Sequence, residues 1–330
     1  MSLAFIHISI LCFLLVTVLA IVRMRDLLAV VMLLSIYSLL SACFFVVMDA
    51  VDVAFTEAAV GIGISTLLLL STLALTKRFE RPHRTEPVLA LFLVLTTGAL
   101  LVYGTLQMPP FGSASAPAHQ HVAAYYIEQS FLDTGIANMV TSVLASYRGY
   151  DTLGELMVIF TAGIGVLALL ELKTDTKVSR KTEIPAPMAA HHILRIVSKM
   201  LIPFILMFAL YVQFHGDFGP GGGFQAGVIF SSAIVLYTMV FGLDAALKVI
   251  SFAWLRFFAA LGGLVFGATG VLALVSGKNF LDYHALAEDP IRAQHLGVLL
   301  VEVGVGITVA AVIILVFMSF TRQMAENGKA

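Results

Sequence analysis

The chain has 330 residues, of which 60% are hydrophobic and only 12% are charged, and its mean hydropathy is +0.99. This composition is typical of a protein whose main solvent is lipid, so it predicts a polytopic membrane protein. The formal net charge of -1 shows no basic excess, which argues against nucleic acid as a partner. Cys12 and Cys43 both fall in apolar runs; we therefore predict neither a disulfide framework nor a metal site, and we assign no cofactor.

Apolar windows of about 20 residues predict an all-α fold with about nine transmembrane helices. The windows cover residues 4–22, 27–47, 57–76, 88–107, 152–172, 196–214, 223–241, 252–275 and 296–320. The first window has no Lys or Arg ahead of it, which favours a retained helix over a signal peptide.

The distribution of Lys and Arg predicts the orientation, because cytoplasmic loops of membrane proteins hold the positive charge. An N-terminus outside and a C-terminus in the cytoplasm place all 19 basic residues on the cytoplasmic side except Arg148, Lys278 and Arg292. We therefore expect the N-terminus outside and the C-terminus in the cytoplasm.

Two basic linkers that contain proline divide the chain into three predicted segments. These segments are residues 1–78 with three helices, residues 85–173 with two, and residues 193–325 with four. Within the second segment, residues 108–135 form an outer loop that becomes mildly amphipathic from His121 onward. We expect a short interfacial helix in that part of the loop.

Glu57 occupies the edge of a predicted transmembrane helix, where a carboxylate is costly unless protein or water surrounds it. Helical spacing places Glu57, Gly61 and Ser65 on one face, which suits a hydrated path, and Asp52 is expected just outside the helix. An alternative interpretation is that Glu57 only occupies the first helical turn, where the helix dipole favours an acid.

A second group of charges follows the outer loop. Arg148, Asp151 and Glu155 stand at positions i, i+3 and i+7, so a helix would place all three on one side. Arg148 can neutralise Asp151, while Glu155 lies deeper and can exchange a proton. The alternative is structural: Asp151 caps the following helix and Arg148 anchors the membrane interface.

A glycine-rich stretch, HGDFGPGGGFQAG, separates two later apolar runs. Its composition favours a tight reversal that brings backbone groups close together. The alternative interpretation is an ion-lining role for His215, Asp217 or Gln225. The other candidates in this stretch are Pro220, Gly221, Gly222, Gly223, Phe224 and Gly227.

The last predicted helix carries two further titratable residues. His295 and Glu302 are seven residues apart on one helix face, and Glu302 is deep enough to need a partner. A proton step between them is one interpretation; a hydrogen bond from His295 to another helix is the other. Small residues at a spacing of four predict helix packing through Gly223 with Gly227 and Gly263 with Gly267.

These motifs resemble subunits of the Mrp-type multisubunit cation/proton antiporters. The stretch FHGDFGPGGGFQAG with its following helix is similar to the signature of MrpB (MnhB) subunits. DVAFTEAAVG resembles an MbhD-like region, and NMVTSVLASYRGYDTLGELMVIF resembles an MbhE-like region. Val51 and Ala226 depart mildly from the family pattern, which commonly has proline and glycine there.

The resemblance implies a subunit, not an enzyme, of a complex that exchanges sodium or another monovalent cation for protons. It also implies a location in the bacterial inner (plasma) membrane. Its implied partners are the other subunits, including a large antiporter-like subunit, together with the lipid bilayer. The alternative of another class is a membrane-arm subunit of a redox-driven ion pump related to membrane-bound hydrogenase or complex I. A third possibility is a structural adaptor whose acids are all paired.

Overall fold

The computed structural model describes residues 3–80, 87–171 and 192–327, so the segment boundaries expected at residues 85 and 173 lie outside the described residues. Throughout the described ranges the regular structure is helical, apart from one isolated β-bridge between Asp26 and Phe79. Nine helices in these ranges are long and apolar enough to cross a membrane. The prediction of an all-α protein with about nine spans is confirmed.

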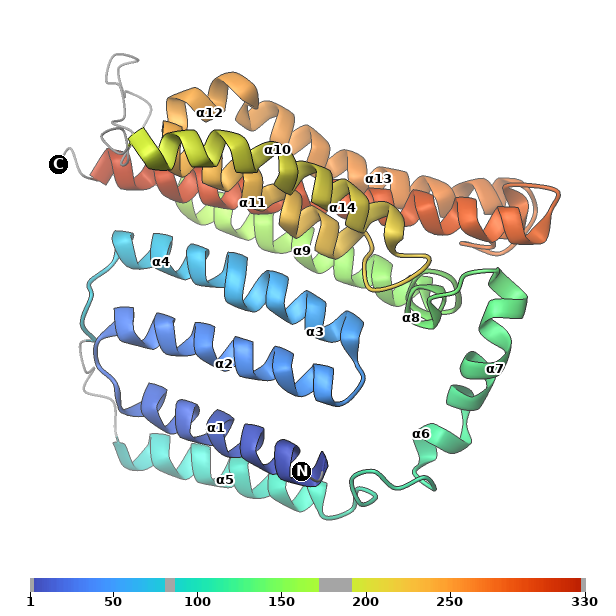
Figure 1. The fold of residues 1–330 in the computed structure, drawn as a ribbon, viewed down its shortest axis with the longest axis horizontal. Helices are drawn as coiled ribbons and strands as arrows, with labels where there is room; N and C mark the ends of the chain where they lie inside the picture. The colour runs from blue at the N-terminus through green and yellow to red at the C-terminus, as the bar shows by residue number, and fades with distance from the viewer. Residues whose placement is uncertain (1–2, 81–86, 172–191, 328–330) are drawn as a thin grey trace.

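The first segment consists of three spans that lie side by side, each antiparallel to the next (Figure 1). It contains α1 (Leu3–Arg23), α2 (Leu27–Val47) and a third span made of α3 (Val51–Glu57), η1 (Ala58–Ser65) and α4 (Thr66–Leu75). Asp26 accepts the N–H of Leu28 and caps α2, and its carboxylate pairs with Arg78 at 2.7 Å. This pair joins the two turns at the same end of the row.

The third span differs from the prediction in two ways. It begins at Val51, so Asp52 lies in the first turn of α3 and not outside the helix, and Glu57 is past the first turn. Between Ala58 and Ser65 the helix is of the π type, and the side chain of Thr66, the first residue of α4, donates from Oγ1 to Gly61 O. A π-helix has a wider turn than an α-helix, so the four-residue spacing is not exact there. Gly61 still lies beside Glu57, because a Cβ atom added to Gly61 would be 2.6 Å from Glu57 Oε1.

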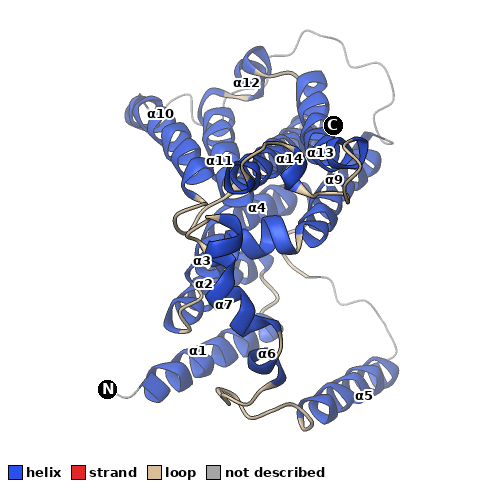
Figure 2. Cartoon of the chain, turned by 90° about the vertical axis from the view of Figure 1, so that its right-hand side faces the viewer, coloured by secondary structure: helices blue, strands red, loops and turns tan. Residues whose placement is uncertain are grey.

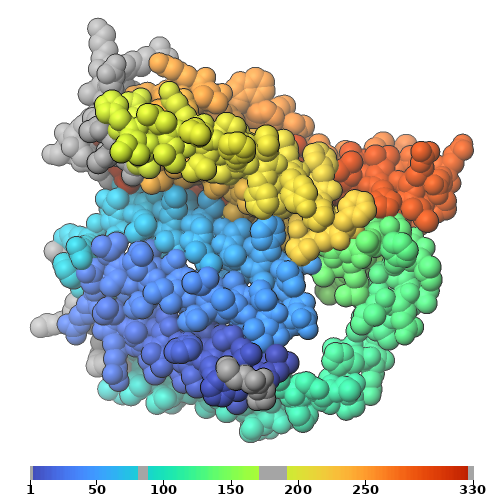
Figure 3. All heavy atoms as spheres, in the orientation of Figure 1, coloured from blue at the N-terminus to red at the C-terminus, as the bar shows by residue number. Residues whose placement is uncertain are grey.

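The second segment begins with α5 (Pro87–Thr105), which Figure 2 shows set apart from the other helices. None of its apolar span is buried within the chain (0%). The outer loop then forms α6 (Pro117–Gln120), which was not predicted, and α7 (Val122–Thr134), where the pattern from His121 onward predicted a short helix. In the space-filling view, open space separates the outer loop with α6 and α7 from α2 and α3 (Figure 3).

After α7 the chain turns at Gly135, whose φ of 71° lies in the left-handed region. It continues through α8 (Met139–Thr141) and the π-helix η2 (Ser142–Tyr147) into the long helix α9 (Gly149–Glu171), which holds the next candidate span. Asn138 caps α8 by accepting the N–H of Val140 at 3.0 Å.

The third segment contains four spans, and the last of them is the central helix. Its elements are α10 (His192–His215), α11 (Gly223–Phe241), α12 (Leu243–Val249), α13 (Phe252–Val275), η3 (Tyr283–Ala285) and α14 (Pro290–Asn327). The span in α14 is the most buried of all, at 67%, because α9, α11 and α13 pack around it. At about 1.5 Å per residue, its 38 residues are about 57 Å long, well beyond a hydrocarbon core of roughly 30 Å.

The start of α1 and the end of α14 lie at opposite ends of the helices, as an odd number of spans requires (Figure 1). This arrangement agrees with the predicted topology, although which end faces the cytoplasm stays a prediction. The turn Gly216–Gly222, the residues 276–289 and α7 all lie at the end that the topology assigns to the outside.

Candidate functional site: an acidic cavity where three segments meet

A cavity of about 510 Å³ lies where the three segments of the chain meet. It is partly open, and residues of α3, α8, η2, α9, the 216–222 turn, α11 and α14 line it. Its lining holds three carboxylates, those of Asp52, Glu155 and Glu302, and the described residues around it include no Lys, Arg or His. The remaining lining residues are Val53, Thr56, Val140, Thr141, Leu144, Ala145, Thr152, Val158, Ile159, Gly221, Gly222, Gly223, Phe224, Gln225, Val301 and Val305.

Glu302 reaches the cavity from α14, and the glycine turn leaves room for its carboxylate. A Cβ atom added to Gly222 would lie 3.1 Å from Glu302 Oε1, and one added to Gly216 would lie 3.2 Å from Oε2. Gly222 also has a φ of 119°, a conformation that side chains rarely permit. The turn is therefore glycine-rich for two reasons: its backbone conformation and the carboxylate beside it.

Asp52 and Thr56 bring α3 to the same cavity. Asn138 Nδ2 donates to Asp52 Oδ1 at 3.3 Å, and Gln225 Nε2 of α11 donates to Thr56 Oγ1 at 2.8 Å. Both bonds join the first segment to a later one. They hold the acid of α3 against the end of the cavity that the glycine turn borders.

Glu155 contributes the third carboxylate, from the second turn of α9. The ion pair predicted between Arg148 and Asp151 is present, with Nε to Oδ2 at 2.5 Å. Its two side chains are 60% and 48% exposed, however, and neither lines the cavity. Glu155 thus lies at the cavity, one turn deeper than the Arg148–Asp151 pair, which stays at the surface.

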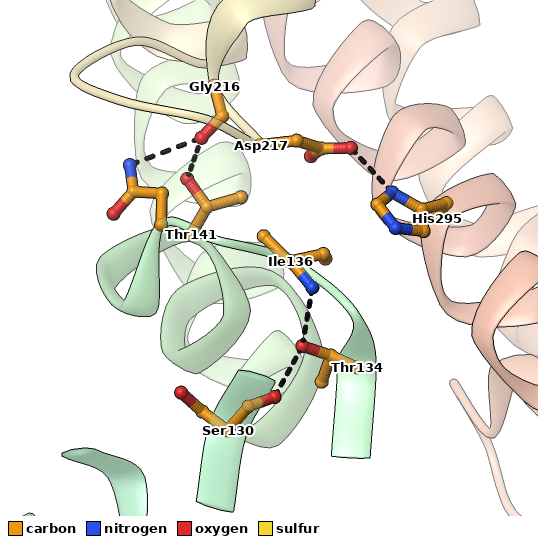
Figure 4. Close-up of polar contacts among 8 residues, drawn as sticks. Ser130, Thr134, Ile136, Thr141, Gly216, Asp217 and His295 are labelled. Atoms are coloured by element: carbon orange, nitrogen blue, oxygen red, sulfur yellow. Dashed lines mark hydrogen bonds and ion pairs between the residues drawn. The ribbon is translucent and has the colours of Figure 1, made fainter. Parts of the chain in front are cut away.

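Asp217 and His295 form a pair just outside the cavity. Asp217 lies in the glycine turn and His295 near the start of α14, with Oδ2 to Nδ1 at 2.8 Å (Figure 4). His295 is therefore hydrogen-bonded, but its partner is an acid of the turn and not a residue of another helix. Glu302, on the same helix, lies beside the glycine backbone instead.

Four other predicted candidates lie outside the lining of this cavity. His215 stacks on Tyr211 with ring centroids 4.8 Å apart, and Pro220 is exposed. Gly227 packs against α14, because an added Cβ would lie 2.7 Å from Gly306 O. Glu57 lies toward α2: a Cβ on Gly61 would be 2.6 Å from Glu57 Oε1 and 2.5 Å from Ser38 Oγ.

Several polar residues of this site were missed by the reasoning from sequence. Thr56, Asn138 and Thr141 are the main ones, and each hydrogen-bonds to another segment or to the glycine turn. For Asn138 a signal existed, since asparagine ahead of a short helix is a frequent N-cap. A threonine within an apolar helix carries no such signal.

On the outer side, tyrosine hydroxyl groups hold the segment that leads into η2. Tyr147 and Tyr125 donate to Asp133 Oδ2 at 2.6 and 2.8 Å, and these two bonds hold the pKa of Asp133 below its ordinary value. The Tyr283 hydroxyl donates to Ala145 O at 2.6 Å, and burial raises the pKa of this phenol. These contacts fix η2 between α7 and η3.

Family profiles match three parts of the chain. Residues 193–315 match a domain related to the MnhB subunit of Na+/H+ antiporter, residues 12–78 match the MbhD subunit of MBH, and residues 89–181 match the MbhE subunit of MBH. Each of the three carboxylates in the cavity thus comes from a different matched region.

Two curated relatives illustrate the similarity. A Rhizobium meliloti protein, named as a probable A/B subunit of a K(+)/H(+) antiporter, is 27% identical over 331 residues, which are 92% of this chain and 33% of the relative. A Staphylococcus aureus protein named "Putative antiporter subunit mnhB2" is 35% identical over 132 residues, which are 39% of this chain and 93% of the relative. The chain thus spans about a third of the first relative and nearly all of the second.

Two solved structures have the same architecture. The Mrp complex from a Dietzia species contains a chain with a TM-score of 0.75 and 25% identity, covering 95% of this chain and 34% of that one. The membrane-bound sulfane sulfur reductase, an archaeal respiratory membrane complex, gives a TM-score of 0.53 at 29% identity, covering 70% of this chain and 97% of that one.

Proposed function

Because the chain belongs to the MnhB family of antiporter subunits, we propose that it is an inner-membrane subunit of a multisubunit monovalent cation/proton antiporter. Within that complex the acidic cavity supplies part of the ion or proton path. Its partners are the other subunits of the complex, and its transported ions are protons and a monovalent cation.

The observation that carries this proposal is the convergence of Asp52, Glu155 and Glu302 on one cavity from three separate regions. Carboxylates at membrane depth are costly and are kept where ions or protons move. With no basic residue among its described lining residues, the cavity favours a cation or bound protons. Glu57, Arg148, Asp151 and His295 are secondary candidates, because they lie outside the lining.

The alternative function is that of a membrane-arm subunit in a redox-driven ion pump. The similarity to the archaeal sulfane sulfur reductase complex and the matches to MbhD and MbhE favour it. The two functions differ in their energy source. Purification of the complex in mild detergent distinguishes them: iron–sulfur proteins accompany the chain only in the redox-driven case.

The transport test uses everted membrane vesicles that contain the whole complex and a host without other antiporters. A respiratory pH gradient is formed, and its dissipation on adding Na+, K+ or Li+ is followed by a fluorescent amine. We expect Glu302→Gln to lower this exchange by about tenfold or more, equal to at least about 1.4 kcal/mol of activation free energy.

The matched control is Glu128→Gln, which removes the same charge from an exposed position on α7. It is expected to transport like the wild type. Equal exchange by the Glu302→Gln, Glu155→Gln and wild-type complexes, at equal assembly, would instead assign the cavity acids a structural role.

A further inference from the structure

Asn138 occupies the point where the three segments of the chain come together. Its side chain is only 8% exposed, and its Nδ2 lies 2.9 Å from Gly219 O, 3.1 Å from Gly216 O and 3.3 Å from Asp52 Oδ1. Its Oδ1 accepts the N–H of Val140, and this bond decides which atom of the amide is the oxygen and which is the nitrogen. One side chain thus connects α3, α8 and the glycine turn.

The amide nitrogen has two hydrogens but three oxygen atoms within reach. Asp52 therefore competes with two backbone carbonyl groups for the same donor. An ionised carboxylate accepts more strongly than a carbonyl group, whereas a protonated one accepts weakly. The hydrogen bond that Asn138 gives to Asp52 is thus the one that depends on the charge of Asp52.

The glycine turn does not depend on this side chain alone. Thr141 Oγ1 donates to Gly216 O at 2.7 Å (Figure 4), and the backbone N–H of Asn138 donates to Asp217 O at 2.9 Å. Both bonds remain when the Asn138 side chain is shortened. Loss of the amide therefore removes a donor from Asp52 while the turn keeps two of its anchors.

We propose that Asn138 is a positioning residue for Asp52: it holds the carboxylate at the cavity and links its charge to the glycine turn that borders Glu302. When Asp52 is ionised, the amide hydrogen is drawn to it; when Asp52 is neutral, both hydrogens go to Gly216 and Gly219. The other acids at the cavity are Glu155 and Glu302. This inference rests on the proposed function, in which Asp52 belongs to the path.

A double-mutant cycle tests whether Asn138 acts through Asp52. Cation-dependent exchange by the whole complex is measured in vesicles for Asn138→Ala, Asp52→Asn and the double variant. One charge-assisted hydrogen bond corresponds to about a tenfold effect, so Asn138→Ala is expected to lower exchange by about that factor. In the Asp52→Asn background the same change is expected to have less than about a twofold effect.

A second measurement is independent of transport. Dicyclohexylcarbodiimide modifies carboxyl groups that are protonated in apolar surroundings, and mass spectrometry of the assembled complex gives the labelling rate of Asp52. Without the amide donor, the ionised form of Asp52 loses a stabilising contact. We therefore expect Asn138→Ala to raise the labelling rate by several-fold, up to about tenfold.

The control is Thr134→Val in the same connecting segment. Thr134 is 1% exposed, donates to Ser130 O at 2.6 Å and accepts from Ile136 N at 3.2 Å, without lining the cavity (Figure 4). This variant loosens the segment but keeps the donor to Asp52, so the labelling rate should match the wild type. A similar rise in both variants would show that loosening alone exposes Asp52, and the inference would be wrong.

The transport measurement and the labelling measurement also distinguish a failure of this inference from a failure of the proposed function. Wild-type exchange by Asp52→Asn would refute the role of Asp52 in the path, whereas unchanged labelling in Asn138→Ala would refute its positioning by Asn138. Equal losses from Asn138→Ala in both cycle backgrounds would assign Asn138 to anchoring the turn only.

Discussion

Replacing Gly223 with alanine is expected to separate α11 from α14 and to disturb the cavity between them. A Cβ atom at this position would lie 2.0 Å from Glu302 O, 2.8 Å from Glu302 C and 3.0 Å from Gly306 N. All three are backbone atoms, which no rotamer change can move. Since a carbon–oxygen contact needs roughly 3.3 Å, the two helices must move apart by roughly 1 Å.

The expected loss of stability from the steric clash exceeds the gain from the higher helix propensity of alanine. Overpacking of a tight contact costs about 1–3 kcal/mol, whereas exchanging glycine for alanine in a helix gains at most about 1 kcal/mol. Thermal unfolding of the purified complex in mild detergent measures the balance. We expect a lower Tm for Gly223→Ala, together with reduced cation exchange in vesicles, because Glu302 moves with α14.

Gly267→Ala is the matched control for this prediction. It makes the same chemical change in the middle of α13, where an added Cβ meets no heavy atom within 4 Å. Its Tm should equal or exceed that of the wild type. If Gly223→Ala were as stable and active as Gly267→Ala, the close approach of α11 to α14 would not be a constraint on this site.

Three further outcomes are expected. Tyr147→Phe removes a hydrogen-bond donor that lowers the pKa of Asp133. The stabilisation from this lowered pKa is fully present above the ordinary pKa of the carboxyl group and is lost as pH falls through the lowered one. The decrease in Tm should therefore be present at neutral pH and shrink at acidic pH, and a decrease that is constant with pH would contradict this reasoning. Arg148→Gln breaks an exposed pair with Asp151 and should change stability by less than about 1 kcal/mol, measured as a Tm shift against wild type. Gln225→Leu removes the amide that joins α11 to α3; exchange should fall at equal assembly, and equal exchange would mean that this bond does not position the cavity.

The helices themselves were predicted well because their signal is local. A run of about 20 apolar residues identifies a span without any knowledge of its neighbours. The seventh and eighth windows, residues 223–241 and 252–275, coincide with α11 and α13. The tight reversal before α11 was also predicted, since five glycines and a proline leave few other conformations.

The faces of the helices were predicted less well. Gly223 and Gly227 do pack against α14, as their spacing suggested, but Gly263 and Gly267 do not pack tightly in the described chain. On α13 the close contact is at Gly262, where a Cβ would lie 2.3 Å from Gly304 O. In a bilayer both sides of a helix are apolar, so hydrophobicity cannot distinguish the buried face from the lipid face.

The sequence by itself determined the membrane class, the spans and the rarity of acids within them, because each follows from the composition of one short stretch. Only the tertiary structure decided which acids act together. Asp52, Glu155 and Glu302 are far apart in the chain, and each reaches the cavity from a different segment. The convergence of the three acids depends on contacts between helices, such as the hydrogen bonds of Asn138, and no local pattern encodes those contacts.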